Sequence, residues 1–252
     1  MRKTLATALA GTLVLTGIGV AQATPIETLN FTIKLNRADR NKKTGALTLR
    51  TAFKITDTSG GRPPALTNTT LRFPKGAAVN ARFFKRCSPD RLTAKGVSGC
   101  PSASIIGRGK AQGDARPIVN DPIDAKITMF NGPTRNGNPT IVIYAVPEIS
   151  SPIVIVGELK RQPRSSSYGY VLSVDVPPIP TLPGQPNASV SFFDATTLDK
   201  TVKRKGRTIH YIQGPVICDG TFFLLDGSFS YDGGITNTVL ERFTLRGGPR
   251  CP

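Results

Sequence analysis

The chain has 252 residues and carries 33 Lys and Arg against 16 Asp and Glu, a formal net charge of +17. It contains one His, four Cys and no Trp, which excludes catalytic sites and metal centres that need several imidazoles. Glycine and proline are abundant, with 25 and 21 residues, and both disfavour long helices. The composition therefore favours a β-rich protein.

The first 23 residues have the features of an export signal. Arg2 and Lys3 precede an uncharged stretch, residues 4–20, and Ala21-Gln22-Ala23 forms a small-x-small cleavage motif. An uncleaved membrane anchor is disfavoured because the apolar part is shorter than the roughly 20 residues that span a bilayer. We expect cleavage near Ala23, no transmembrane segment in the mature chain, and a secreted or cell-envelope location.

The predicted strands begin with two clearly alternating segments. Residues 29–35 and 47–55 each place an apolar or β-branched side chain at every second position, so each strand has one buried and one solvated face. Further strands are predicted at residues 70–73, 81–85, 104–106, 125–130, 140–146, 153–160, 168–176, 188–193, 208–212, 221–225, 228–231 and 238–245. This pattern predicts an all-β, antiparallel β-sandwich, either jelly-roll-like or built from two packed β lobes.

One short helix is predicted between Ser88 and Gly96. Ser88 is a candidate N-cap, Pro89 suits the first helical position, Asp90 lies in the first turn, and Gly96 can end the helix. Sharp turns are predicted at Asp219-Gly220, Asp226-Gly227 and Asp232-Gly233, and a hairpin tip is predicted around Gly206.

Residues 24–252 are expected to form a single β-sandwich domain. The proline-rich residues 176–187 favour a crossover loop within one sheet system, because the apolar Ile179 and Leu182 would be exposed to water in a solvated linker. A boundary between two sub-lobes at this segment is the alternative.

The four cysteines are Cys87, Cys100, Cys218 and Cys251. In an exported protein an even number of cysteines predicts disulfide bonds. Three pairings are compatible with the sequence, and local pairing of Cys87 with Cys100 and of Cys218 with Cys251 is favoured because each pair brackets one continuous segment. A zinc site is disfavoured because no C-x-x-C motif occurs and His210 lies eight residues from Cys218. We expect neither a metal nor a cofactor.

Positive charge is concentrated in the amino-terminal half of the chain. Loss of Arg2 and Lys3 with the signal leaves a net charge of +15, and residues 24–116 hold 18 basic and 5 acidic residues. Such a surface attracts anionic cell-wall polymers or lipid headgroups and is screened by salt. Three clusters supply the candidate anion-binding residues: Lys34, Arg37, Arg40, Lys42 and Lys43; Arg82, Lys85 and Arg86; and Lys203, Arg204, Lys205 and Arg207. Specific nucleic-acid recognition is not expected, because exposed aromatics are not interleaved and no binding motif occurs.

Catalysis by a Ser-His-Asp or Cys-His arrangement would have to use His210, and the chain lacks a G-x-S-x-G motif. His210 alternates with Ile209 and Tyr211, so we expect a solvent-facing or hydrogen-bonded structural histidine. Hydrolysis by two carboxylates needs no histidine. Its candidates are Glu148 with Glu158, or Asp121 with Asp124.

A block of about forty residues resembles a segment of exported, uncharacterised β-sandwich proteins of actinobacteria. It comprises Leu71-Arg72-Phe73-Pro74-Lys75-Gly76, Asn80, Phe84, Cys87, Leu92, Cys100-Pro101, Ser104 and Ile106-Gly107-Arg108-Gly109-Lys110-Ala111. A glycine-rich aromatic segment between Cys218 and Cys251 is similar more loosely. The resemblance implies a β-sandwich without an established activity, and it supports pairing of Cys87 with Cys100, which share the block.

The sequence thus predicts a secreted or envelope-associated, non-enzymatic β-sandwich protein that binds anionic surface components through its basic amino-terminal half. A secreted carboxylate-based polysaccharide hydrolase or lyase is one alternative. A purely structural surface module is the other.

Overall fold

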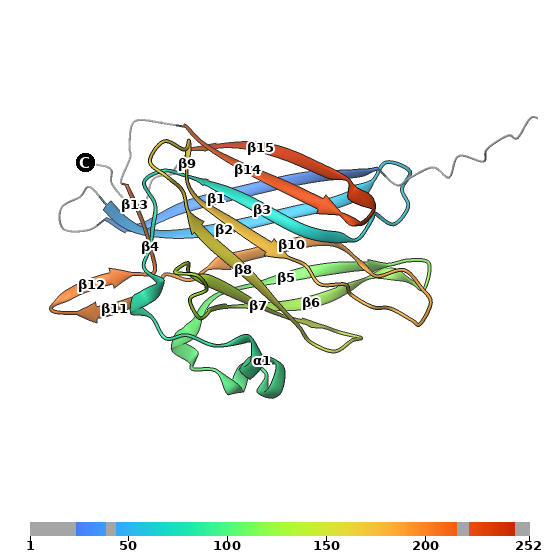
Figure 1. Cartoon of the computed structure of the whole chain (residues 1–252), viewed down its shortest axis with the longest axis horizontal. Helices are drawn as coiled ribbons and strands as arrows, with labels where there is room; N and C mark the ends of the chain where they lie inside the picture. The colour runs from blue at the N-terminus through green and yellow to red at the C-terminus, as the bar shows by residue number, and fades with distance from the viewer. Residues whose placement is uncertain (1–23, 39–43, 216–221, 245–252) are drawn as a thin grey trace, which may run out of the picture.

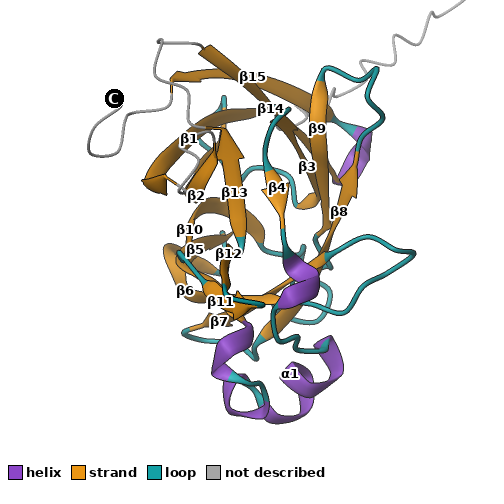
Figure 2. Ribbon diagram, turned by 90° about the vertical axis from the view of Figure 1, so that its left-hand side faces the viewer, coloured by secondary structure: helices purple, strands orange, loops and turns teal. Residues whose placement is uncertain are grey.

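A computed structural model describes residues 24–38, 44–215 and 222–244. The protein is mostly β, with one short α-helix and a large antiparallel sheet of 13 strands that is not closed. The predicted all-β fold class is confirmed. The two layers of the predicted sandwich are halves of one continuous sheet that folds over on itself (Figures 1 and 2).

The first eight strands are β1 (Pro25–Ala38), β2 (Thr44–Asp57), β3 (Leu66–Pro74), β4 (Ala78–Val79), β5 (Ile105–Ala115), β6 (Val119–Asn131), β7 (Thr140–Pro147) and β8 (Ile153–Arg161). The remaining strands are β9 (Tyr168–Asp175), β10 (Ser189–Thr197), β11 (Thr201–Arg204), β12 (Arg207–His210), β13 (Ile212–Pro215), β14 (Phe222–Tyr231) and β15 (Thr236–Thr244). The helices are α1 (Pro89–Lys95) and the 3-10 turns η1 (Ala81–Phe83), η2 (Val97–Gly99), η3 (Ser102–Ser104) and η4 (Asp232–Gly234).

The strand order in the large sheet is β15-β14-β3-β9-β8-β7-β6-β5-β10-β2-β13-β4, with β1 paired to β2. The hairpin β11-β12 forms a separate two-stranded sheet that projects from one end of the molecule (Figure 1). Strands β9 and β10, which flank residues 176–187, belong to the same sheet. No helix within the described ranges is long and apolar enough to cross a membrane.

The alternating strands form the main core as their pattern predicts. Leu29 and Ile33 of β1 pair with Phe53 and Leu49 of β2, and the inward side chains of β1 are at least 91% buried. Phe53 contacts Phe193 of β10 and Phe229 of β14, with 5.2 Å between ring centroids in each pair. Burial of each large apolar side chain contributes about 1.5–3 kcal/mol. The inward-facing Phe53 of β2 therefore contacts both layers of the fold.

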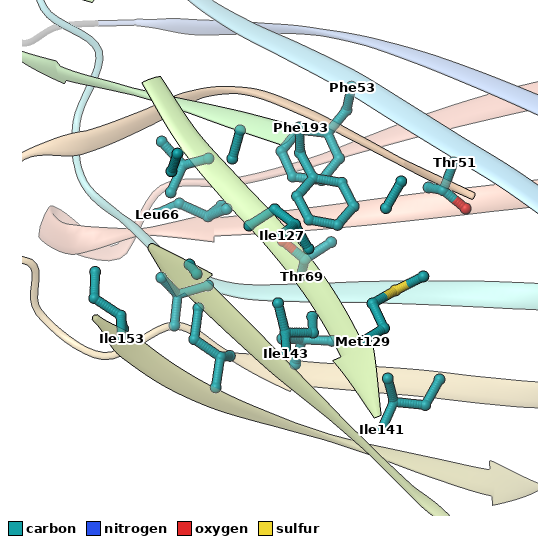
Figure 3. Close-up of a pocket in the computed structure, with 18 of the residues that line it drawn as sticks. Thr51, Phe53, Leu66, Thr69, Ile127, Met129, Ile141, Ile143, Ile153 and Phe193 are labelled. Atoms are coloured by element: carbon teal, nitrogen blue, oxygen red, sulfur yellow. The ribbon is translucent and has the colours of Figure 1, made fainter. Parts of the chain in front are cut away.

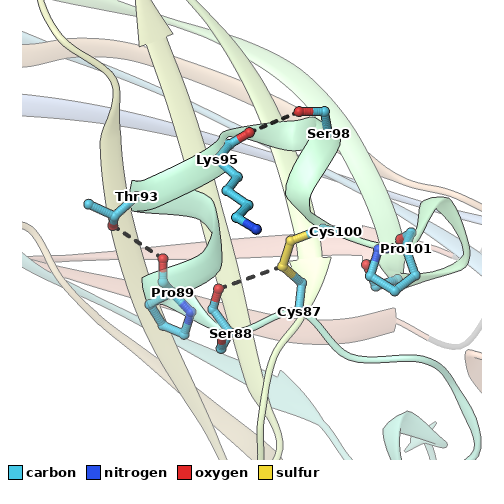
Figure 4. The surroundings of a disulfide bond; sticks show 9 residues. Cys87, Ser88, Pro89, Thr93, Lys95, Ser98, Cys100 and Pro101 are labelled. Carbon is cyan, nitrogen blue, oxygen red and sulfur yellow. Dashed lines mark hydrogen bonds between the residues drawn. A yellow bond between two sulfur atoms is a disulfide. The ribbon is translucent and has the colours of Figure 1, made fainter.

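A smaller core lies on the outer face of the sheet, beneath α1 (Figure 2). Cys87 and Leu92 pack there against Phe130 of β6 and Val142 of β7. Cys87 and Cys100 form a disulfide with 5.5 Å between their Cα atoms, and the loop that it closes contains α1 (Figure 4). Both this disulfide and the short helix are confirmed.

The helix begins after Ser88 and ends at Gly96, whose positive φ of 60° favours glycine. Ser88 occupies the N-cap position as predicted, but its side chain makes no capping hydrogen bond. Cys218, Cys251 and the predicted signal, residues 1–23, lie outside the described residues. Pairing of Cys218 with Cys251 stays a prediction.

Two local predictions are wrong for reasons that involve distant residues. Residues 81–85 do not form a strand, because the buried Asn131 amide donates to the carbonyls of Ala81 and Lys85 at 3.0 and 3.1 Å and holds this segment in and after η1. Asp226-Gly227 is not a turn but lies within β14. The Asp226 carboxylate accepts hydrogen bonds from Arg72 of the adjacent strand β3 and from Tyr168 of β9, which keeps the segment extended.

Two predicted turns are confirmed. Lys205 and Gly206 both have positive φ at the tip of the β11-β12 hairpin, as a two-residue turn requires. Gly233 in the turn after β14 also has a positive φ, of 79°.

Candidate apolar-ligand cavity

The folded sheet encloses a cavity of about 400 Å³ between its two layers. Strands β2, β3 and β5 to β10 contribute most of the lining, and Figure 3 shows 18 of the lining side chains around the space. The labelled lining residues are Thr51, Phe53, Leu66, Thr69, Ile127, Met129, Ile141, Ile143, Ile153 and Phe193. The volume is within the range of pockets that hold small molecules, about 300–1,000 Å³.

Strand alternation determines which side chains reach the cavity. Ile127 and Met129 of β6 face it, and so do their cross-strand partners on β7, Ala145 and Ile143. The intervening residues of these strands lie on the outer face. Small inward residues, including Ala145 and Ala195, leave space that larger aliphatic side chains would fill.

No lining residue within the described structure is Asp, Glu, Lys, Arg, His or Cys. Two of the polar lining groups have partners in the protein. The Thr197 hydroxyl accepts a hydrogen bond from the Leu49 amide at 2.8 Å, and the Tyr211 hydroxyl donates to Asn131 at 3.1 Å. Burial raises the pKa of Tyr211 well above its usual value, so this hydroxyl stays neutral. The cavity therefore suits an uncharged ligand.

Thr69 of β3 differs from these groups. It is 95% buried and lines the cavity, yet its hydroxyl oxygen has no hydrogen-bond partner among the described residues. Buried hydroxyls in folded proteins nearly always have a partner. Thr69 is therefore the one buried polar group of the described lining that the protein leaves unsatisfied.

The cavity reaches the surface beside Ile149 and Leu182, which line it although 64% and 57% of their areas are exposed. We call these two residues the mouth. Ile149 lies in the β7-β8 turn and Leu182 in the proline-rich segment between β9 and β10. That segment folds compactly, since the Ala188 amide donates to the Ile179 carbonyl at 2.8 Å.

The candidate anion-binding residues lie on other parts of the molecule. Of the first cluster, Lys34 is exposed on β1; the Arg37 side chain and all of Arg40, Lys42 and Lys43 lie outside what the structure describes. Lys85 and Arg86 are exposed between η1 and the disulfide loop.

Of the second cluster, Arg82 adjoins the hollow that the third cluster lines, through its contact with Phe83. The Arg82 guanidinium lies 4.6 Å from the centroid of the Phe83 ring, a cation–π contact. Phe83 and Ile209 line one shallow hollow together with the hairpin cations Lys203, Arg204, Lys205 and Arg207. We call this set the basic hollow. No acidic side chain is among the described residues that line it.

A further group of cations was not predicted as a site. Exposed basic side chains occupy the outer face of three strands, with β10 between β2 and β5: Arg50 and Lys54 of β2, Arg108 and Lys110 of β5, and Lys126 of β6. Asp194 of β10 accepts two hydrogen bonds from Arg50, at 2.8 and 2.6 Å, and these lower the pKa of Asp194. The sequence pattern could have revealed this group, because basic residues occupy alternate-face positions within the predicted strand 47–55 and the block 107–111.

The candidate catalytic acids do not meet in the cavity. Glu148 follows the end of β7, whereas Glu158 pairs with Thr140 at the start of β7, so this pair lies at opposite ends of the hairpin. Asp121 and Asp124 are exposed on β6, and the Asp124 carboxylate accepts a hydrogen bond from Gln112 at 2.9 Å.

His210 is 94% buried, and its Nδ1 lies 3.1 Å from the Asp199 carboxylate. The prediction of a hydrogen-bonded structural histidine is confirmed. Within the described ranges, no group of three or more His, Cys, Asp and Glu side chains is placed to hold a metal ion.

No family model, no curated protein and no solved structure matches this chain.

Proposed function

We propose that this protein binds an uncharged, apolar small molecule in the cavity between its sheet layers. The observation that carries the proposal is the cavity of about 400 Å³, whose lining contains no charged side chain within the described structure. Apolar ligands enter such cavities because their surface leaves water, which contributes about 25 cal/mol per Å².

Stability favours the same conclusion. An empty apolar cavity costs folding free energy, because its lining atoms lose their packing partners. A ligand that fills it stabilises the folded state in proportion to the logarithm of its concentration. Together with the predicted export signal, the cavity supports the proposal of a secreted or envelope-associated, non-enzymatic binding protein.

The proposal is tested by photolabelling with benzophenone, a neutral apolar ketone that attaches to nearby C–H bonds under ultraviolet light. We expect labelled peptides to come from cavity-lining strands, including the segment with Met129 and Ile127, and labelling to fall when diphenylmethane competes. Labelling spread over the surface, or unaffected by diphenylmethane, would contradict the proposal. The protein would then fit a structural surface module better.

A second candidate function is binding of an anionic polymer at the basic hollow. The observation that favours it is that all four cations of the hairpin cluster line one hollow together with Phe83, whose ring the Arg82 guanidinium contacts. Four cations around one hollow attract phosphate or carboxylate groups, and salt weakens this attraction. The basic hollow and the cavity use different residues, so the two functions are separable.

A further inference from the structure

We infer that the ligand is an apolar molecule with one uncharged hydrogen-bonding group, and that the Thr69 hydroxyl binds this group. The inference rests on the proposed function and specifies its ligand class. Thr69 lines the cavity, is 95% buried, and has no hydrogen-bond partner for its hydroxyl oxygen among the described residues.

The surroundings of Thr69 explain why the protein itself supplies no partner. Its cross-strand neighbours are Val174 of β9 and Phe229 of β14, both buried and apolar. Leu71, the next inward residue of β3, is apolar too. These neighbouring strands offer the hydroxyl no polar side chain, and the cavity that Thr69 lines is where a ligand could supply one.

Four other polar groups of the lining each have a partner in the protein. Thr197 accepts from a backbone amide, Tyr211 donates to Asn131, and the Thr181 hydroxyl donates to the Pro186 carbonyl. The Gln112 amide donates to Asp124 on the outer face. Thr69 differs from these four groups because its hydroxyl has no partner at all among the described residues.

The chemistry of the anchor defines the ligand class. A hydroxyl both donates and accepts, so it binds an alcohol, a ketone, an ester or an amide. A carboxylate, phosphate or ammonium group is excluded from this position, because the described lining offers no opposite charge and burial of an unpaired charge is very costly. The ligand is thus a neutral lipid-like molecule with a single polar function.

Three probes of one shape test the inference: diphenylmethane, benzophenone and benzhydrol, which carry a methylene, a carbonyl and a hydroxyl at the same position. Their dissociation constants are measured for the wild type and for Thr69→Val. We expect the variant to bind benzophenone and benzhydrol about fivefold more weakly, the effect of one lost hydrogen bond, and diphenylmethane equally well. Thr69→Ser, which keeps the hydroxyl, should restore ketone and alcohol binding.

Thr51→Val is the matched control, because Thr51 lines the same cavity from β2. Equal loss of ketone binding in both variants, or loss in Thr51→Val alone, would overturn the assignment of Thr69. Unchanged ketone binding in Thr69→Val would also overturn it, while diphenylmethane binding to the wild type would leave the proposed function intact. Failure of all three probes to bind the wild type would overturn both.

Discussion

Tyr231 and Glu27, which are 204 positions apart, are joined by a hydrogen bond from the Tyr231 hydroxyl to the Glu27 carboxylate. The Asn237 amide donates to both oxygens of the same carboxylate, at 3.0 and 3.2 Å, and to the Pro25 carbonyl at 3.0 Å. These side chains connect β1 to β14 and β15. In the described structure no backbone ladder joins β1 to either of these two strands. They hold together the two edges of the folded sheet.

Replacement of Glu27 by Ala should therefore destabilise the fold. The change leaves the buried Tyr231 hydroxyl without its acceptor, and we expect the free energy of unfolding to fall by about 1–3 kcal/mol in urea denaturation. Glu148→Ala removes the same charge from an exposed turn and should change stability little. Equal effects of the two substitutions would show that the connection contributes nothing.

Acid should destabilise the end of the molecule near Asp114. Burial raises the pKa of Asp114, but its hydrogen bonds and ion pair with Arg116 outweigh burial and hold the pKa below its usual value. The Arg116 guanidinium also donates to the carbonyls of Gly60 and Gly61, so the pair fixes the β2-β3 turn. A carboxyl with a lowered folded pKa stabilises above its unfolded pKa, near 3.9, and this stability is lost as pH falls.

The measurement is urea unfolding across the acid range for the wild type and Asp114→Asn. We expect the variant to be less stable at neutral pH, by about 1–3 kcal/mol, and to lose less stability than the wild type below about pH 4. Asp90→Asn, an exposed acid in α1, serves as the control. Parallel pH curves for the wild type and Asp114→Asn would contradict the assignment.

Removal of the confirmed disulfide should weaken the small outer core. The Cys87–Cys100 loop spans 13 positions, and loss of both cysteines by substitution with Ala should lower the free energy of unfolding by about 3 kcal/mol. Peptide mapping without reduction checks the pairing and also tests the prediction that Cys218 pairs with Cys251. A peptide that links Cys87 to Cys218 or Cys251 would contradict the local pairing.

The basic hollow should dominate binding to polyanions if the second candidate function holds. Alanine at the four hairpin cations should lower the salt concentration that elutes the protein from phosphocellulose, more than a control variant of equal charge. The hollow variant replaces Lys203, Arg204, Lys205 and Arg207; the control replaces the exposed Arg91, Lys95, Arg161 and Arg164. Equal elution of the two variants would assign retention to overall charge.

Local sequence patterns predicted the elements that local chemistry determines. Alternation in residues 29–35 and 47–55 predicted strands and their buried faces, and the residues from Ser88 to Gly96 predicted a helix within a disulfide loop. Patterns failed where distant partners decide the conformation. The Asn131 amide donates to the Ala81 carbonyl and so keeps residues 81–85 out of a strand. Hydrogen bonds from Arg72 and Tyr168 hold Asp226 within a strand, although Asp-Gly favours a turn.

The cavity was not predicted, for a physical reason. Alternation shows that Ile127, Ile143 and Ala145 face inward, but the same pattern describes residues that fill a core and residues that surround a space. The distinction depends on the separation of the two layers and on where small residues such as Ala195 meet. Likewise, the sequence shows Thr69 as one of several strand threonines, and only the packing of Val174 and Phe229 around it leaves its hydroxyl without a partner.

Binding of an apolar ligand in the cavity is tested by a substitution that fills the cavity, Ala145→Phe. Ala145→Phe places a ring in the cavity, whereas Val146→Phe places the same ring on the outer face at the next position of β7, where the native side chain is 37% exposed.

The measurement is the dissociation constant of diphenylmethane for the wild type and both variants. We expect the wild type and Val146→Phe to bind equally well, and Ala145→Phe to bind about tenfold or more weakly while remaining folded. Unchanged binding by folded Ala145→Phe, or no binding by the wild type, would show that the ligand does not occupy this cavity.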